Sequence, residues 1–97
     1  MKKLNRILIV GAGEAGAALV NDLRQRGLGN GIAAFADDDQ SKLGTTVAGV
    51  EVKGDTSELS SICAELSITD VIIAIPSAKT SLINRITSGV LSYNRSI

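Results

Sequence analysis

The sequence predicts an α/β fold, a Rossmann-like three-layer sandwich in which helices cover both faces of a parallel sheet. Two continuous apolar runs, at Ile7–Val10 and Val71–Ile75, are typical of buried parallel strands. Helical periodicity follows each predicted strand, and a glycine-rich turn joins the first strand to its helix. Strands that alternate with amphipathic helices imply right-handed crossovers, and the expected strand order is 3-2-1-4.

The first βα unit begins with a strand over about Arg6–Val10, and its helix spans about Glu14–Arg26. Gly27 is a natural stop for this helix. The second strand is about Gly31–Ala36. Within Thr45–Gly54, Val50 and Val52 alternate with the polar residues Glu51 and Lys53, which predicts a short, half-exposed third strand. The expected buried positions of the first helix are Ala15, Ala18, Leu19 and Leu23.

The second half of the chain repeats the strand and helix pattern. Asp55, Thr56 or Ser57 can cap a helix, and the fourth strand is about Asp70–Ile75. Pro76 ends that strand. The last helix is expected to start with Ser77 as its cap and to bury Leu82, Ile83, Ile86 and Val90. No strand follows that helix, so we expect a truncated fold whose fourth strand has an exposed edge, open to pairing with a second copy.

The size and composition of the chain predict one small domain, residues 1–97, as a fragment of a larger protein. It has 97 residues, of which 44% are hydrophobic, and ten basic residues balance ten acidic ones. The absence of a basic stripe argues against a nucleic-acid partner. With no histidine and with Cys63 as the single cysteine, we expect no metal site, no disulfide and no catalytic residues. A lone thiol fits a cytoplasmic location.

The glycine turn is the strongest candidate binding site. Gly11, Gly13 and Gly16 follow a strand and precede a helix in the spacing G-x-G-x-x-G. Gly11 permits the tight turn, Gly13 leaves room for a pyrophosphate, and Gly16 allows close packing of helix on strand. Ala12, Glu14 and Ala15 belong to the same phosphate-binding turn, with the Glu14 carboxylate expected to face outward or toward a partner. The alternative is a tight turn that binds nothing.

Acidic residues at the end of the second strand favour a dinucleotide. Asp37 lies 21 positions after Gly16, where a carboxylate can accept hydrogen bonds from the ribose hydroxyls of adenosine. The same carboxylate repels a 2′-phosphate, so NAD is expected in preference to NADP. Asp38 and Lys42 are expected to bind the ligand next to Asp37, although both residues also fit a solvated loop. Across the cleft, the fourth strand is expected to contribute Ile75, Pro76 and Ser77.

Four segments together resemble the N-terminal nucleotide-binding domain of bacterial polysaccharide-biosynthesis proteins, the nucleoside-diphosphate-sugar epimerase/dehydratases of the capsular-polysaccharide type. The segments are Ile7–Gly16, Phe35–Asp39 with Lys42 and Gly44, Gly49–Gly54, and Val71–Ala78. The resemblance implies a Rossmann-like, CoA-binding-like module that precedes a separate catalytic domain, in a parent protein anchored at the inner membrane. It implies that Gly11–Gly16 line the cofactor phosphates, Asp37 the ribose, and Ile75–Ser77 the far side of the cleft.

The function predicted is therefore binding of NAD or a related nucleotide or nucleotide sugar, in a parent epimerase, dehydratase or dehydrogenase of surface-polysaccharide synthesis. Two alternatives stay open. One is an NADH-sensing domain of a redox-responsive repressor, although no basic or winged-helix segment is present. The other is the sugar-nucleotide domain of an acyltransferase, although Glu14 and Ala15 stand where such proteins commonly have a histidine.

Overall fold

The structure is a computed structural model that describes residues 5–95; for residues 94 and 95 it describes the backbone only. Helices and strands alternate along the chain as the sequence predicts. The strands are β1 (Ile7–Val10), β2 (Ile32–Ala36), β3 (Thr46–Val47), β4 (Val50–Gly54) and β5 (Asp70–Ile73), and the α-helices are α1 (Glu14–Gln25), α2 (Leu59–Leu66) and α3 (Thr80–Arg95). Single 3₁₀ turns η1 (Gly29–Gly31), η2 (Gln40–Lys42) and η3 (Thr56–Glu58) occupy three of the connections.

The sheet confirms the predicted order and adds one strand. Its order is β3-β4-β2-β1-β5, in which the parallel strands β4, β2, β1 and β5 correspond to the expected 3-2-1-4. The predicted short, half-exposed strand is confirmed as β4, whose residues are alternately buried and exposed. The sequence did not predict β3, which pairs with β4 in an antiparallel hairpin. Its turn places Ala48 at φ 52° and Gly49 at φ 79°, and two consecutive positive φ angles are what a tight two-residue hairpin requires. The sheet is therefore mixed at this edge.

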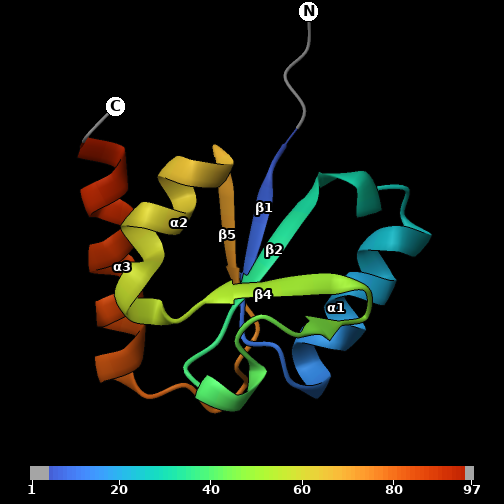
Figure 1. Ribbon diagram of the computed structural model, residues 1–97, viewed down its shortest axis with the longest axis horizontal. Coiled ribbons are helices and arrows are strands. Elements are labelled where there is room, and N and C mark those ends of the chain that lie inside the picture. Colours follow the sequence, from blue (N-terminus) through green and yellow to red (C-terminus); the bar gives the residue numbers. More distant parts are fainter. Residues whose placement is uncertain (1–4, 96–97) are drawn as a thin grey trace, which may run out of the picture.

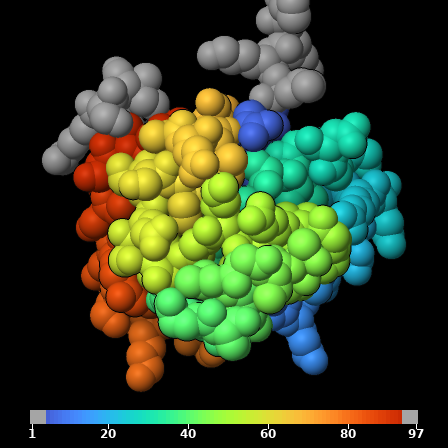
Figure 2. All heavy atoms as spheres, viewed as in Figure 1, coloured from blue at the N-terminus to red at the C-terminus, as the bar shows by residue number. Residues whose placement is uncertain are grey.

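Three layers are visible in Figure 1, with α1 on one face of the sheet and α2 and α3 on the other. Alternate residues of β1 face opposite layers: Ile7 and Ile9 contact the α1 side, whereas Leu8 and Val10 contact the α2 and α3 side. Figure 2 shows the hairpin and the loop before it, in green and yellow-green, covering the near face. With only two aromatic residues in the chain, branched aliphatic side chains build most of both core clusters.

The buried stripes of the helices differ in part from the predicted ones. On α1 the buried residues are Gly16, Val20 and Leu23, and the expected core residue Ala18 is exposed. On α3 Ile86 is buried as predicted, but Ile83 is 40% exposed. On α1 the buried face is rotated by about one residue from the face predicted on hydropathy, whereas on α3 the predicted residues Leu82, Ile86 and Val90 are at least partly buried and only Ile83 is exposed.

The ends of β5 and α3 also differ from expectation. The strand stops at Ile73 rather than at residue 75, and α3 begins at Thr80 rather than directly after Ser77. The N–H of Ala74 still donates to the carbonyl oxygen of Val10 at 2.8 Å, so the chain leaves the sheet only after this residue. Among the described residues β5 pairs with β1 alone, which leaves its outer edge unpaired as predicted. None of the described helices is long and apolar enough to cross a membrane.

Candidate functional site

The register of the central strands brings three connections to one edge of the sheet. Val10 is aligned with Ala36 on β2 and with Ile73 on β5. The residues that follow these positions are Gly11, Asp37 and Ala74, so they meet at the carboxyl end of the sheet. In parallel α/β sheets this is the edge at which ligands bind.

The three motif glycines differ in what surrounds them, and the surroundings of Gly11 and Gly16 agree with the predicted tight turn and close helix packing. Gly11 has φ +112°, and a Cβ there would lie 2.7 Å from the carbonyl oxygen of Ala74. Gly16 is buried where α1 crosses the strands, and a Cβ there would collide with the carbonyl oxygen of Gly11 and with the Phe35 ring. Gly13 is different, because a Cβ there meets nothing within 4 Å. Folding therefore requires glycine at positions 11 and 16, whereas at position 13 the free space belongs to a pocket.

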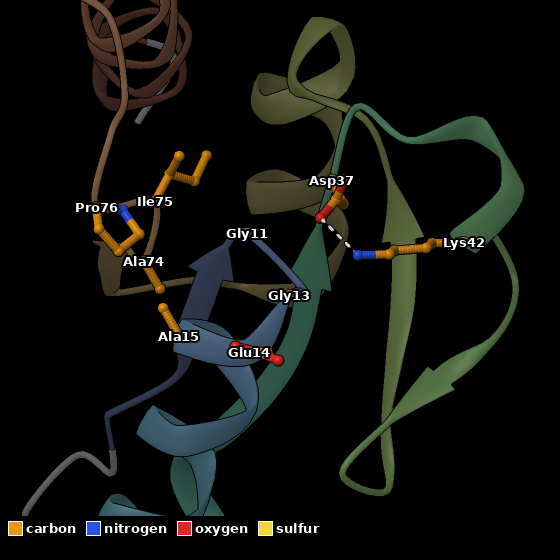
Figure 3. A pocket seen from close by; sticks show the side chains of 9 residues that line it. All are labelled: Gly11, Gly13, Glu14, Ala15, Asp37, Lys42, Ala74, Ile75 and Pro76. Carbon is orange, nitrogen blue, oxygen red and sulfur yellow. Dashed lines mark ion pairs between the residues drawn. The ribbon is translucent and has the colours of Figure 1, made fainter.

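This pocket has a volume of about 580 Å³ and lies between the start of α1 and the ends of β2 and β5. Its two sides differ in chemistry (Figure 3). Ala74, Ile75 and Pro76 form an apolar side, with Ala15 beneath them, and Asp37 and Lys42 form the opposite, charged side. The glycine turn runs between the two sides, and the first residue of α1, Glu14, completes the lining. A ligand that spans the pocket would therefore have an apolar end, a middle over backbone N–H groups, and a polar end.

Asp37 is fixed at the polar end by two backbone hydrogen bonds. Its Oδ2 accepts from the N–H of Ala12 at 2.7 Å, and its Oδ1 accepts from the N–H of Asp39 at 2.8 Å. The side chain is only 17% exposed, so the carboxylate has one orientation and no room to swing away. Each oxygen keeps a second lone pair that can accept a hydrogen bond from a ligand hydroxyl.

Lys42 lies beside this carboxylate. Its Nζ is 4.0 Å from Oδ2 of Asp37 and donates to the carbonyl oxygen of Ala12 at 3.4 Å. The ammonium group thus bridges the glycine turn and the acid that follows β2. Its position is set by η2, whose preceding residue Asp39 accepts hydrogen bonds from the backbone and side chain of Ser41. The Ser41 side chain, more than its backbone N–H, lowers the pKa of Asp39 from its ordinary value.

Asp38, predicted to take part in cofactor binding, lies outside the pocket lining. Its carboxylate accepts from the backbone N–H of Thr56 at 2.8 Å and from the Thr56 hydroxyl at 2.7 Å, and it pairs with Arg85 at 3.4 Å. Asp38 therefore ties the loop after β2 to η3 and α3. Nothing local in the sequence signals this role, because Arg85 lies 47 residues away.

Of the other predicted site residues, Gly11, Gly13, Glu14, Ala15, Ile75 and Pro76 line the pocket. Ala12 and Gly16 are buried behind the lining, where Ala12 supplies the N–H and carbonyl groups that hold Asp37 and Lys42. Ser77 is exposed and lies outside the lining. Ala74 lines the pocket although the sequence interpretation assigned it to the strand, because β5 ends one residue before it.

The pocket combines the uncapped start of a helix with few ionisable side chains. Helix α1 has no side-chain cap, so its first N–H groups and the positive end of its dipole face the pocket. Glu14, Asp37 and Lys42 are the ionisable groups of the lining. No group of three or more potential metal ligands occurs within residues 5–95. Cys63 lies on the buried face of α2 and outside this lining, and burial raises the pKa of its thiol.

Comparison with known proteins places this geometry in a family. Residues 2–86 match the CoA binding domain family. The probable polysaccharide biosynthesis protein EpsC of Bacillus subtilis (strain 168) is 38% identical over 77 residues, which are 78% of this chain and 13% of EpsC. The chain thus spans only a small part of that curated relative.

Solved structures agree at the level of the fold. UDP-D-quinovosamine 4-dehydrogenase from Vibrio fischeri matches with a TM-score of 0.76 and 32% identity, over 94% of this chain and 73% of that one. RSP in complex with beta-NADH, a structure of a Rex-family repressor, matches with a TM-score of 0.69 and 23% identity, over 88% of this chain and 41% of that one. The second likeness shows the fold alone. With a family match over most of its length and a dehydrogenase relative above 30% identity, this chain belongs to the CoA-binding domain family, a group of Rossmann-like nucleotide-binding domains with relatives in polysaccharide biosynthesis.

Proposed function

We propose that the chain binds the adenosine-diphosphate half of NAD(H) as the nucleotide-binding domain of a sugar-nucleotide epimerase, dehydratase or dehydrogenase, and that it performs no chemistry of its own. The observation that carries this proposal is the free space over Gly13, which lies between the uncapped start of α1 and the Asp37 carboxylate. That arrangement offers N–H donors to a diphosphate and, at one end, an acceptor to a ribose.

Each part of an ADP-ribose unit has a counterpart in the pocket. The diphosphate would lie over the glycine turn, where adding a side chain at position 13 would displace it. The ribose hydroxyls would donate to the oriented oxygens of Asp37. The group beyond the diphosphate would meet the apolar side at Ala74, Ile75 and Pro76.

The polysaccharide context rests on the relatives. EpsC is named as a polysaccharide biosynthesis protein, and the Vibrio protein is named for acting on a UDP-sugar. Both support a sugar-nucleotide pathway for the parent protein, with a further catalytic domain as the partner of this one. The NADH-sensing alternative predicts the same ligand with a DNA-binding partner, and the RSP complex shares only the fold with this chain.

The test is isothermal titration calorimetry of the chain with NAD, ADP-ribose and a UDP-sugar. We expect ADP-ribose and NAD to bind and Asp37→Ala to weaken both. Glu51→Ala is the matched control, since it removes an exposed carboxylate of β4 that lies outside the pocket lining. Absence of heat with all three ligands up to millimolar concentration would refute the proposal. Binding of the UDP-sugar alone would move the assignment to the acyltransferase alternative.

We also propose that the unpaired edge of β5 associates with a second copy of the chain. The support is the open edge itself, next to Ile73, which is 37% exposed at the end of that strand. Light scattering over a range of concentrations should show a dimer. A mass that stays monomeric at every concentration would exclude this association.

A further inference from the structure

The charged end of the pocket is more acidic than a site for a phosphorylated ribose should be. The segment from Asp37 to Lys42 carries three carboxylates and one ammonium group. Arg85 offsets the charge of Asp38 on the far side of the loop. Asp37 and Asp39 then remain against Lys42, and the adjoining pocket residue Glu14 is acidic as well.

Lys42 is already engaged in this arrangement. Its Nζ contacts both the Asp37 carboxylate and the carbonyl oxygen of Ala12, and its side chain is two-thirds buried at 34% exposure. Because this ammonium group already offsets the charge of Asp37, it supplies little net positive charge to a ligand phosphate at this end of the pocket. Asp37 itself cannot turn aside, because two backbone N–H groups hold its oxygens.

A free ribose and a phosphorylated ribose meet this carboxylate very differently. Ribose hydroxyls donate hydrogen bonds to the two oriented oxygens. A phosphate monoester at neutral pH has a charge of about −1.5 to −2 and offers acceptors only, so it would face Asp37 with like charge and no donor. Repulsion between like charges in a partly desolvated pocket is stronger than in water.

We infer that this pocket accepts nucleotides with free ribose hydroxyls and rejects those with a ribose phosphate, so that CoA, with its 3′-phosphate, is a poor ligand of this member of the CoA-binding family. Asp37 is the residue that determines this specificity. Lys42 limits the discrimination, because its charge partly offsets that of Asp37. This inference rests on the proposed function, since it assumes that the ribose lies at Asp37.

The experiment compares CoA with dephospho-CoA, which differ only in the 3′-phosphate. Calorimetry on the wild-type chain should give a dissociation constant about tenfold or more lower for dephospho-CoA, a factor that corresponds to about 1.4 kcal/mol. The ratio should fall as salt is added, because screening weakens a charge effect. ADP-ribose is titrated in parallel to establish that the site binds the shared part of these ligands.

Three variants test which residue causes the difference in affinity between CoA and dephospho-CoA. Asp37→Asn keeps an oxygen for the Ala12 N–H but removes the charge, and it should bring the ratio of the two dissociation constants close to one. Lys42→Gln should raise the ratio, because the offsetting cation is gone. Glu51→Gln removes the same charge at an exposed position of β4 outside the pocket lining and should leave the ratio unchanged. Thermal unfolding of each variant checks that it is folded.

The outcomes separate this inference from the proposed function. If ADP-ribose binds but CoA binds as tightly as dephospho-CoA or more tightly, the inference is overturned and the proposed function stands. A preference for CoA that disappears in Lys42→Gln would identify Lys42 as a phosphate ligand instead. If ADP-ribose does not bind at all, both are overturned.

Discussion

Gly13 allows binding and folding to be tested apart, because its missing side chain leaves space in the pocket and not in the core. A Cβ built at this position has no neighbour within 4 Å, and the backbone there has φ −88°, which any residue can adopt. The replacement Gly13→Ala should therefore fold normally and place a methyl group where the ligand's diphosphate is expected to lie.

The effect on stability should be close to zero. Alanine is a poorer helix N-cap than glycine, which costs roughly 0.5 kcal/mol. It also lowers the conformational entropy of the unfolded chain, which stabilises the fold by about 0.4–1 kcal/mol. The two terms nearly cancel, so the melting temperature should change by less than about 4 °C. Affinity for ADP-ribose should fall about tenfold or more, since the diphosphate must move off the helix N-terminus.

Gly16→Ala is the matched comparison, because it adds the same methyl group three residues further along the chain, where it enters the core instead of the pocket. Its Cβ would lie 2.9 Å from Cε1 of Phe35 and closer still to the carbonyl oxygen of Gly11. Overpacking of this kind costs about 1–3 kcal/mol or more. Differential scanning calorimetry should show a melting temperature lower by at least about 4 °C for this variant.

Calorimetric titration with ADP-ribose on the wild type and both variants completes the test. Unchanged affinity in a well-folded Gly13→Ala would refute the reasoning, because the methyl group would then lie outside the ligand's path. A large loss of stability in Gly13→Ala would refute it in another way, since it would show that the space over the turn is needed for folding.

Three further predictions concern the parts around the pocket. Asp38→Ala should lower the free energy of unfolding by about 1–2 kcal/mol in a denaturant titration, because the buried N–H and hydroxyl of Thr56 lose their acceptor; an unchanged midpoint would contradict it. The Ser41 hydroxyl and N–H lower the pKa of Asp39 below 3.8, so the stabilisation from these hydrogen bonds is present above that pH and is lost as the pH falls through the lowered pKa. Ser41→Ala should therefore reduce the fall of the melting temperature in acid. An identical fall in the variant and the wild type would count against the hydrogen bonds. Cys63 is buried with a raised thiol pKa, so a thiol reagent should label it fast only after unfolding, and rapid labelling of the native chain would show that α2 opens readily.

The glycine turn and the acid after β2 could be predicted from the sequence because their causes are local. An apolar run, three glycines at fixed spacing and a helical pattern specify the turn within ten residues of one another. The position of Asp37 at the end of β2 follows from the length of one βα unit. The order of the parallel strands follows in the same way from chain connectivity and the handedness of crossovers.

What could not be predicted depends on contacts between distant residues or on backbone conformations that sequence patterns do not record. Ala48 adopts a positive φ to close the β3–β4 hairpin, although alanine is not a typical turn residue. The contacts of the Asp38 side chain are with Thr56 and Arg85, which lie beside it only in the folded chain. Between β5 and α3 the chain makes a turn in which the N–H of Ala78 donates to the carbonyl oxygen of Ile75, and Ser77 lies in this turn, outside the pocket lining.

The central claim is that a nucleotide lies across the glycine turn with its diphosphate at the start of α1 and its ribose at Asp37. A titration of the ¹⁵N-labelled chain with ADP-ribose, followed by two-dimensional NMR, tests it most directly because each backbone N–H reports its own surroundings. The account predicts saturable shifts concentrated at Ala12, Gly13 and Glu14, with a second group at Asp37 to Lys42. Shifts confined to the outer edge of β5 or to the exposed face of α3, with the glycine turn unchanged, would contradict it.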